Sequence, residues 1–82
     1  MRWHDILVEY GNEVLEGTGF TIKPFQTSHA LMVVTCNGKS YRFIIIGRKL
    51  WINGNGIDLN HPNMLEQYKE ALWEVVNNRN WG

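Results

Sequence analysis

The chain contains 82 residues, carries a formal net charge of zero and is 44% hydrophobic. This length fits a single domain, residues 1–82, because two independent cores would be too small to fold. The composition is typical of a globular protein and argues against disorder. Cys36 is the only cysteine, so no internal disulfide can form and a reducing compartment, the cytoplasm, is expected. No apolar run has the length of a signal peptide or a membrane span, and we expect no membrane partner.

The charges are unevenly distributed along the chain. Residues 1–16 contain four acidic residues and one arginine, and residues 58–82 contain four acidic residues and two cations. Residues 17–57 contain five lysines or arginines and no acidic residue. One explanation is that strands disfavour Asp and Glu more than helices do. The other is a basic functional surface in the middle of the chain.

Two amphipathic helices are predicted, over about residues 3–16 and 61–78. In each, apolar residues recur at helical spacing and form one stripe. The first stripe consists of Trp3, Ile6, Leu7, Tyr10 and Val14, and the second of Met64, Leu65, Tyr68, Ala71, Leu72, Val75 and Val76. Gly17 is suited to end the first helix, and Asn60 or His61 to cap the second ahead of Pro62. Gly11, inside the first helix, costs about 1 kcal/mol relative to alanine.

Strands are predicted over about residues 19–24, 29–36, 39–46 and 49–53. Asn37-Gly38 is the favoured dipeptide for a two-residue hairpin turn. Such a turn pairs Cys36 with Lys39, and therefore Met32 with Phe43. Gly47-Arg48 either forms a second two-residue turn, which pairs Ile46 with Lys49, or marks a bulge in one long strand. Residues 53–56 are interpreted as a flexible connection without strand character.

These registers divide the side chains of the sheet between two faces. Face A is apolar throughout and is expected to carry the helices; it comprises Ala30, Met32, Val34, Tyr41, Phe43, Ile45, Leu50 and Ile52. Face B mixes aliphatic, aromatic and cationic residues; it comprises His29, Leu31, Val33, Thr35, Ser40, Arg42, Ile44, Ile46, Lys49, Trp51 and Asn53. The predicted fold class is α+β: helix, an antiparallel meander of three or four strands, helix, with both helices on one sheet face. The alternatives are one helix on each face, or a C-terminal tail around Trp81 that covers face B.

The sequence offers no constellation for catalysis, a metal or a cofactor. Cys36 falls beside a turn as a small apolar residue, without a base to activate it. The three histidines, His4, His29 and His61, lie far apart and lack ligand spacing. Asp and Glu are absent from residues 17–57, so no carboxylate pair is available on the strands for acid–base chemistry or for Mg²⁺. We therefore expect a protein that is not an enzyme.

The order of elements is shared with double-stranded-RNA-binding domains. Those domains bind the phosphates of the RNA with lysines at the start of the last helix. Residues 58–66 of this chain read Asp-Leu-Asn-His-Pro-Asn-Met-Leu-Glu and contain no lysine. The sequence therefore argues against binding of double-stranded RNA.

Face B is the candidate binding surface. An apolar patch with a polar rim is typical of interaction sites, and Trp and Arg are enriched among binding hot spots. The expected binding residues are His29, Leu31, Val33, Arg42, Ile44, Ile46, Lys49 and Trp51. The leading hypothesis is a small binding module that docks a protein partner, or a second copy of itself, through this face. Small inhibitors and adaptors encoded by phages or other mobile elements share these features, by analogy. The alternative partner is a single-stranded nucleic acid, whose phosphates would contact the cations of face B and whose bases would stack on Trp51.

Overall fold

The computed structural model describes residues 3–24, 30–35, 38–52 and 54–77, with the backbone alone for residues 30–35. It contains seven elements in chain order: α1 (Trp3–Val14), β1 (Phe20–Pro24), β2 (Ala30–Thr35), β3 (Ser40–Ile46), β4 (Lys49–Ile52), β5 (Asn55–Asp58) and α2 (Met64–Asn77). Each helix lies inside its predicted range: α1 is two residues shorter at its C-terminal end, and α2 begins three residues later than predicted.

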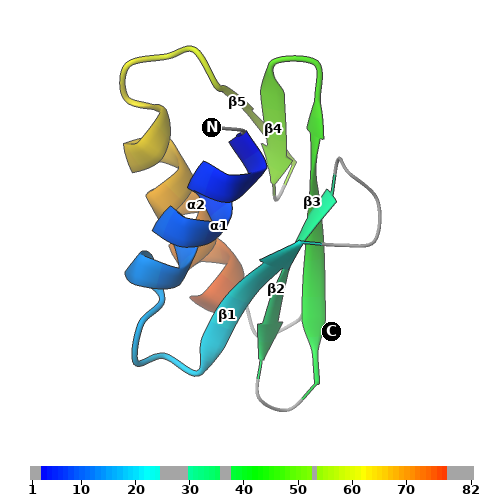
Figure 1. Cartoon of the computed structure of the whole chain (residues 1–82), viewed down its shortest axis with the longest axis vertical. Helices are drawn as coiled ribbons and strands as arrows, with labels where there is room; N and C mark the ends of the chain where they lie inside the picture. Colours follow the sequence, from blue (N-terminus) through cyan, green and yellow to red (C-terminus); the bar gives the residue numbers. More distant parts are fainter. Residues whose placement is uncertain (1–2, 25–29, 36–37, 53, 78–82) are drawn as a thin grey trace.

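The strands form one antiparallel meander in the order β1-β2-β3-β4-β5. Both helices lie on the same side of the sheet, with α1 over the β1 end and α2 along the β5 end (Figure 1). This arrangement confirms the predicted α+β fold, with its two layers and both helices on face A. The sheet has one strand more than the largest number predicted.

The hydrophobic core lies between face A and the two helices. Its members are buried to 5% exposure or less: Leu7, Leu15, Ile22, Phe43, Leu50, Ile52, Ile57, Leu59, Met64, Tyr68, Ala71, Leu72 and Val75. The β3 and β4 residues predicted for face A all belong to this core or pack against it. Trp3 and Leu65 are exceptions to the predicted helical stripes, because their side chains are 38% and 37% exposed.

The hairpin between β3 and β4 has the predicted register. Ile44 pairs with Trp51 and Ile46 pairs with Lys49. Two residues connect the strands, and Gly47 has a φ of 62°, a left-handed conformation that glycine adopts without strain. The turn, and not the bulge, is therefore the correct alternative.

The register between β2 and β3 differs from the predicted one by one residue. Leu31 pairs with Phe43, and Val34 pairs with Ser40, whereas the predicted turn would pair Met32 with Phe43. Residues 36 and 37 of the predicted turn lie outside the described residues. Gly38, which precedes β3, has a φ of 84°, and two-residue and three-residue hairpin loops both favour glycine in such a left-handed conformation. A one-residue shift exchanges the two faces of a strand, and the prediction for β2 was wrong for this reason.

The interpretation of residues 53–56 as a connection without strand character was also wrong. Asn55 and Gly56 begin β5, which pairs with β4 through Ile52↔Asn55, Trp51↔Gly56 and Lys49↔Asp58. Two residues join Ile52 to Asn55, and Gly54 has a φ of 78°. The sequence signal was present, because residues 53 and 54 are Asn-Gly, the dipeptide that favours a two-residue hairpin.

Gly11 has a packing role that its helix propensity does not reveal. A Cβ atom at this position would lie 2.7 Å from Cγ1 of Ile22 and 2.7 Å from the hydroxyl oxygen of Tyr68. The hydroxyl of Tyr68 donates a hydrogen bond to the backbone carbonyl of Leu7, at 2.8 Å. The missing side chain thus lets α1 approach β1 closely and lets Tyr68 of α2 reach the backbone of α1.

Candidate functional site

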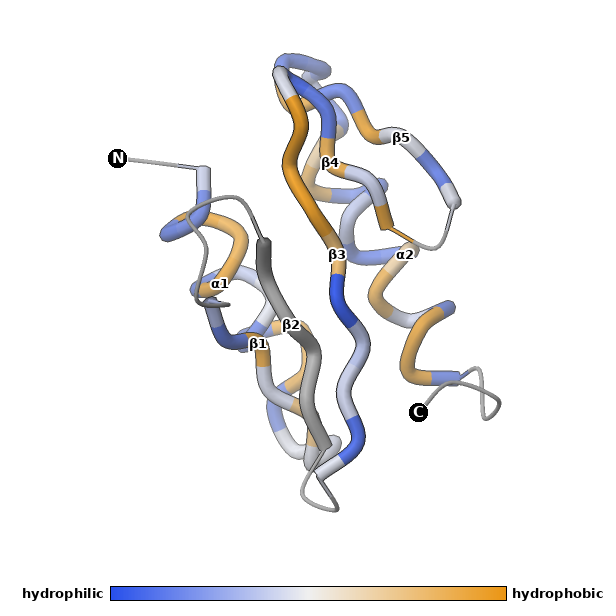
Figure 2. The backbone as a smooth tube through the Cα atoms, turned by 90° about the vertical axis from the view of Figure 1, so that its right-hand side faces the viewer, coloured by the Kyte–Doolittle hydropathy of each residue, from blue (hydrophilic) through white to orange (hydrophobic). Residues whose placement is uncertain are grey.

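Face B is the side of the sheet opposite the two helices, and Figure 2 looks directly at it. Residues paired directly across antiparallel strands share a face. Ile44, Trp51 and Gly56 therefore form one row across β3, β4 and β5, and Ile46, Lys49 and Asp58 form the next. Ile44 is 39% exposed, Ile46 60% and Trp51 40%. Three large apolar side chains are thus contiguous and in contact with solvent.

Trp51 is held in place by its neighbours on this face. A Cβ atom on Gly56 would lie 3.0 Å from both Cη2 and Cζ3 of the indole, so the ring covers the glycine. The Nζ atom of Lys49 lies 5.7 Å from the centroid of the ring, within the range of a cation–π interaction. The aromatic side chain is therefore ordered against the sheet and still 40% exposed.

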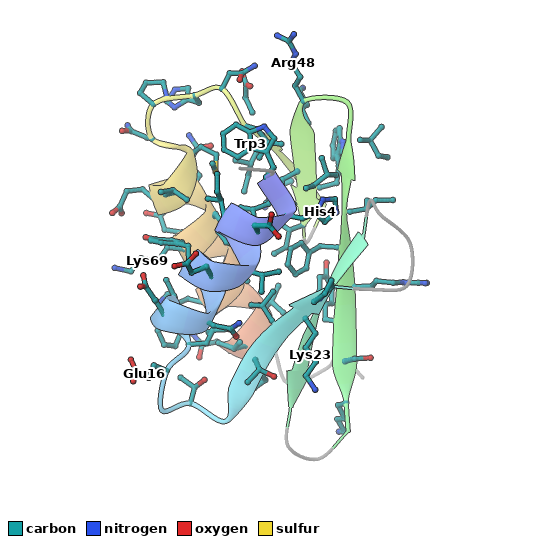
Figure 3. All side chains as sticks on the ribbon, in the orientation of Figure 1. Trp3, His4, Glu16, Lys23, Arg48 and Lys69 are labelled. Carbon is teal, nitrogen blue, oxygen red and sulfur yellow. The ribbon has the colours of Figure 1, made fainter. Side chains whose placement is uncertain are left out.

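Charge separates the two layers of the molecule. Lys23 and Arg42 are both exposed and belong to one row, because each pairs with Met32 of β2. The helices instead carry exposed acidic residues: Asp5, Glu9, Glu13, Glu66, Glu70 and Glu74. Lys69 is a cation on the helical side of the molecule, whereas Lys23 lies on β1 and Arg48 extends from the β3–β4 turn (Figure 3). The sheet layer is therefore basic and the helical layer acidic.

The predicted binding residues fall into three groups. Arg42, Ile44, Ile46, Lys49 and Trp51 lie together on face B. The register moves Leu31 and Val33 out of the rows that contain these residues, since Leu31 pairs with Phe43 and Val33 with Tyr41. It puts positions 30 and 32 there instead, opposite Ile44 and Arg42. His29 lies outside the described residues.

Sequence reasoning missed two positions of this face. Gly56 supports the ring of Trp51, and Asp58 pairs with Lys49. An acidic residue thus lies inside the mainly basic face. The Asn-Gly dipeptide at residues 53–54 was the local signal for the hairpin that brings both residues onto this face.

The titratable groups of the described residues are dispersed. No three His, Cys, Asp or Glu side chains of the described ranges gather where a metal ion could bind. Nε2 of His4 is buried and has no hydrogen-bond partner among these residues. Burial raises the pKa of Tyr68 above its ordinary value, but its hydroxyl is engaged with Leu7 in the core, where it joins the two helices.

No helix within the described ranges is both long and apolar enough to cross a membrane. Comparison of the chain with protein-family models, with curated proteins and with solved structures finds no significant match.

Proposed function

We propose that this protein is a non-enzymatic binding module that docks a protein partner, or a second copy of itself, through face B. The observation that carries the proposal is the contiguous exposure of Ile44, Ile46 and Trp51 on a face that neither helix covers. Lys49 and Arg42 border these apolar side chains. An apolar centre with a polar rim is the usual anatomy of a protein interface, and aromatic residues are frequent hot spots.

The experiment compares two matched substitutions of exposed aliphatic residues. Ile46→Gln alters face B, and Leu65→Gln alters the helical side, where Leu65 is 37% exposed beside Glu9 and Glu13. Sedimentation velocity measures self-association, and affinity capture from an extract of the source cells measures binding of a partner. We expect Ile46→Gln to weaken association or capture about tenfold or more, and Leu65→Gln to leave both unchanged. Equal behaviour of the two variants contradicts the proposal.

A single-stranded nucleic acid is the second candidate, favoured by the position of Lys49 beside the ring of Trp51. The bases of a single strand stack on aromatic rings, and lysine and arginine side chains bind its phosphates. Fluorescence anisotropy with a labelled oligonucleotide measures this activity directly. Affinity should fall steeply between about 50 mM and about 200 mM salt, because phosphate contacts release counterions. No binding even at low salt removes this candidate, and nuclease-resistant capture favours the protein partner.

The place of action that fits this function is the cytoplasm, where the single cysteine stays reduced. A compact inhibitor or adaptor encoded by a phage or another mobile element would combine the same small size, open face and separated charges. This comparison is an analogy of features. Identification of the captured protein by mass spectrometry tests it, and a partner unrelated to defence against mobile elements, or to their control, contradicts it.

A further inference from the structure

The outer edge of β5 presents unpaired backbone groups. The amide of Leu59 donates a hydrogen bond to the carbonyl of Arg48, at 2.9 Å. Bonded and non-bonded pairs alternate along an antiparallel ladder, so Ile57 and Asn55 also bond to β4. The N–H groups of Gly56 and Asp58, and the carbonyl of Gly56, therefore point away from the sheet. Among the described residues, no hydrogen bond reaches these three groups; the carbonyl of Asp58 accepts one from the amide of His61.

The outer edge of β1, at the other end of the sheet, is closed. The amide of Ile22 donates to Oδ1 of Asn12 at 2.7 Å, and its carbonyl accepts from Nδ2 of Asn12 at 3.2 Å. The amide of Phe20 donates to the hydroxyl of Thr18 at 3.2 Å. Pro24, the next residue at an outward position, has no N–H group. Every outward donor of β1 is thus bonded or absent, a protection against strand addition that β5 lacks.

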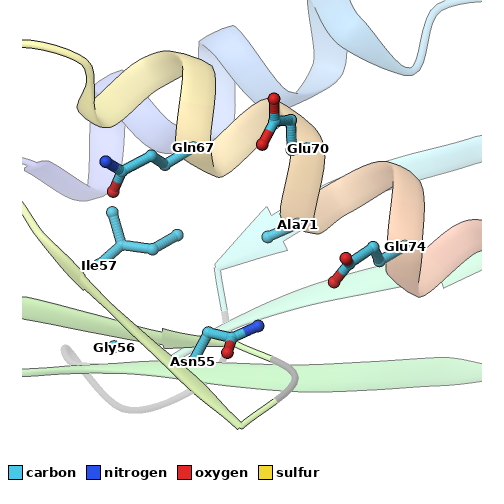
Figure 4. Close-up of a pocket in the computed structure, with 7 residues that line it drawn as sticks. All are labelled: Asn55, Gly56, Ile57, Gln67, Glu70, Ala71 and Glu74. Atoms are coloured by element: carbon cyan, nitrogen blue, oxygen red, sulfur yellow. The ribbon is translucent and has the colours of Figure 1, made fainter.

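A groove of about 220 Å³ runs between β5 and α2. Figure 4 shows Gln67, Glu70 and Glu74 of α2 on one side and residues of β5 on the other. Ala71 and Ile57 give it apolar walls, and no lysine or arginine of the described residues lines it. A strand added to β5 would place alternate side chains over this groove. A lysine or arginine suits such a position, because its stem packs on apolar walls while its head reaches a carboxylate, here that of Glu70.

We propose that the edge of β5 and this groove bind an extended segment of a partner protein, by strand addition, with a lysine or arginine directed at Glu70. Backbone hydrogen bonds provide affinity in this mode, and pockets for alternate side chains provide specificity. A second copy of this chain is a poor occupant. Residues 55–58 contain an aspartate and no cation, and the edge of β1 is closed. The groove lies between β5 and α2, on the helical side of the sheet, whereas the apolar patch lies on face B, so this inference stands independently of the proposed function.

The test uses the full chain, labelled with ¹⁵N, and an acetylated, amidated heptapeptide of sequence Thr-Val-Lys-Val-Lys-Val-Thr. Nuclear magnetic resonance follows the titration and the hydrogen exchange of the amides. We expect the largest shifts at Gly56, Ile57 and Asp58, and exchange of the Gly56 and Asp58 amides slowed about tenfold or more at saturation. A peptide with glutamates in place of the lysines should bind at least about tenfold more weakly.

Two charge reversals on α2 provide the matched comparison. Glu70→Lys changes the groove, and Glu66→Lys changes an exposed position of the same helix outside the groove. We expect Glu70→Lys to weaken binding about tenfold and Glu66→Lys to change it less than about twofold at physiological salt. Equal effects of the two variants, equal binding of the glutamate peptide, or unchanged Gly56 and Asp58 amides overturn the proposal. Concentration-dependent shifts of these amides without peptide would assign the edge to a second copy, and would overturn it as well.

Discussion

The indole of Trp51 lies directly over Gly56, its partner across β4 and β5. The pair leaves only 3.0 Å between two ring atoms and the position that a Cβ atom of residue 56 would occupy. An aromatic side chain that covers a glycine on a neighbouring strand stabilises that strand, because it shields backbone that has no side chain of its own. This contact connects the exposed centre of face B to the edge strand β5.

The first prediction tests this contact by a double-mutant cycle. Gly56→Ala places a methyl group against the ring and should lower the free energy of unfolding by about 0.5–1.5 kcal/mol. In a Trp51→Ala background the same substitution should be neutral or stabilising, since alanine loses less backbone entropy than glycine. Urea denaturation of the four proteins gives the coupling energy. An equal cost in both backgrounds would show that the ring does not rest on residue 56.

The second prediction concerns Gly11 in α1. Helix propensity alone predicts that Gly11→Ala stabilises the helix by about 1 kcal/mol. The contacts at 2.7 Å with Ile22 and the Tyr68 hydroxyl predict the opposite, a loss of about 1–3 kcal/mol from overpacking. Thermal and urea melts measure the sign. Glu9→Ala, an exposed change in the same helix, should stay within about 0.5 kcal/mol, and a stabilising Gly11→Ala would contradict the close approach of α1 to β1.

The third prediction concerns Asn12, which bonds both backbone groups of Ile22. Asn12→Ala leaves a part-buried N–H and carbonyl without these partners, and should cost about 1–3 kcal/mol. The amide of Ile22 should also exchange with solvent faster than in the unmodified protein. Glu13→Ala changes the next, exposed residue and serves as the control. Unchanged exchange at Ile22 would mean that Asn12 does not close the edge of β1.

The fourth prediction tests the β4–β5 hairpin at Gly54. Its φ is 78° and a Cβ atom would meet nothing within 4 Å, so any cost of substitution comes from backbone conformation. Gly54→Val should destabilise the fold by about 1–3 kcal/mol. Gly54→Asn should be tolerated better, because asparagine adopts left-handed conformations more readily than β-branched residues do. Equal melting temperatures for the two variants would argue against the turn that precedes β5.

The fifth prediction follows from the raised pKa of Tyr68, whose cause is burial. Below about pH 10, the ordinary value for tyrosine, the phenol is protonated in both the folded and the unfolded chain. Above it, the unfolded chain releases the proton while the folded chain retains it, so stability falls by up to about 1.4 kcal/mol per pH unit. Tyr68→Phe removes this contribution. The stability advantage of the unmodified protein over Tyr68→Phe should therefore shrink as pH rises above about 10, and a constant difference would contradict the burial.

The helices and the β3–β4 hairpin could be predicted from the sequence because local patterns determine them. Apolar residues at helical spacing identify the face of α1 and α2 that must be buried. Gly47-Arg48 allowed either a two-residue turn or a bulge, and the turn pairs Ile44 with Trp51 as the structure does. The six members of face B on β3 and β4 follow from that register: Ser40, Arg42, Ile44, Ile46, Lys49 and Trp51. Alternation then predicts which side chains of these two strands oppose the core.

Tertiary structure decided the register of β2 and the existence of β5. Both strands depend on an Asn-Gly dipeptide, and a glycine with positive φ fits two-residue and three-residue loops alike. Residues 30–34 are apolar at every position, so their sequence contains no alternation that could choose between the two registers. Asn55 and Gly56 have low strand propensity, and they become a strand only because β4 offers hydrogen bonds and Trp51 covers the glycine. Helix propensity alone predicts that Gly11 destabilises α1. The need for glycine at this position becomes visible only once Ile22 of β1 and Tyr68 of α2 are packed against it.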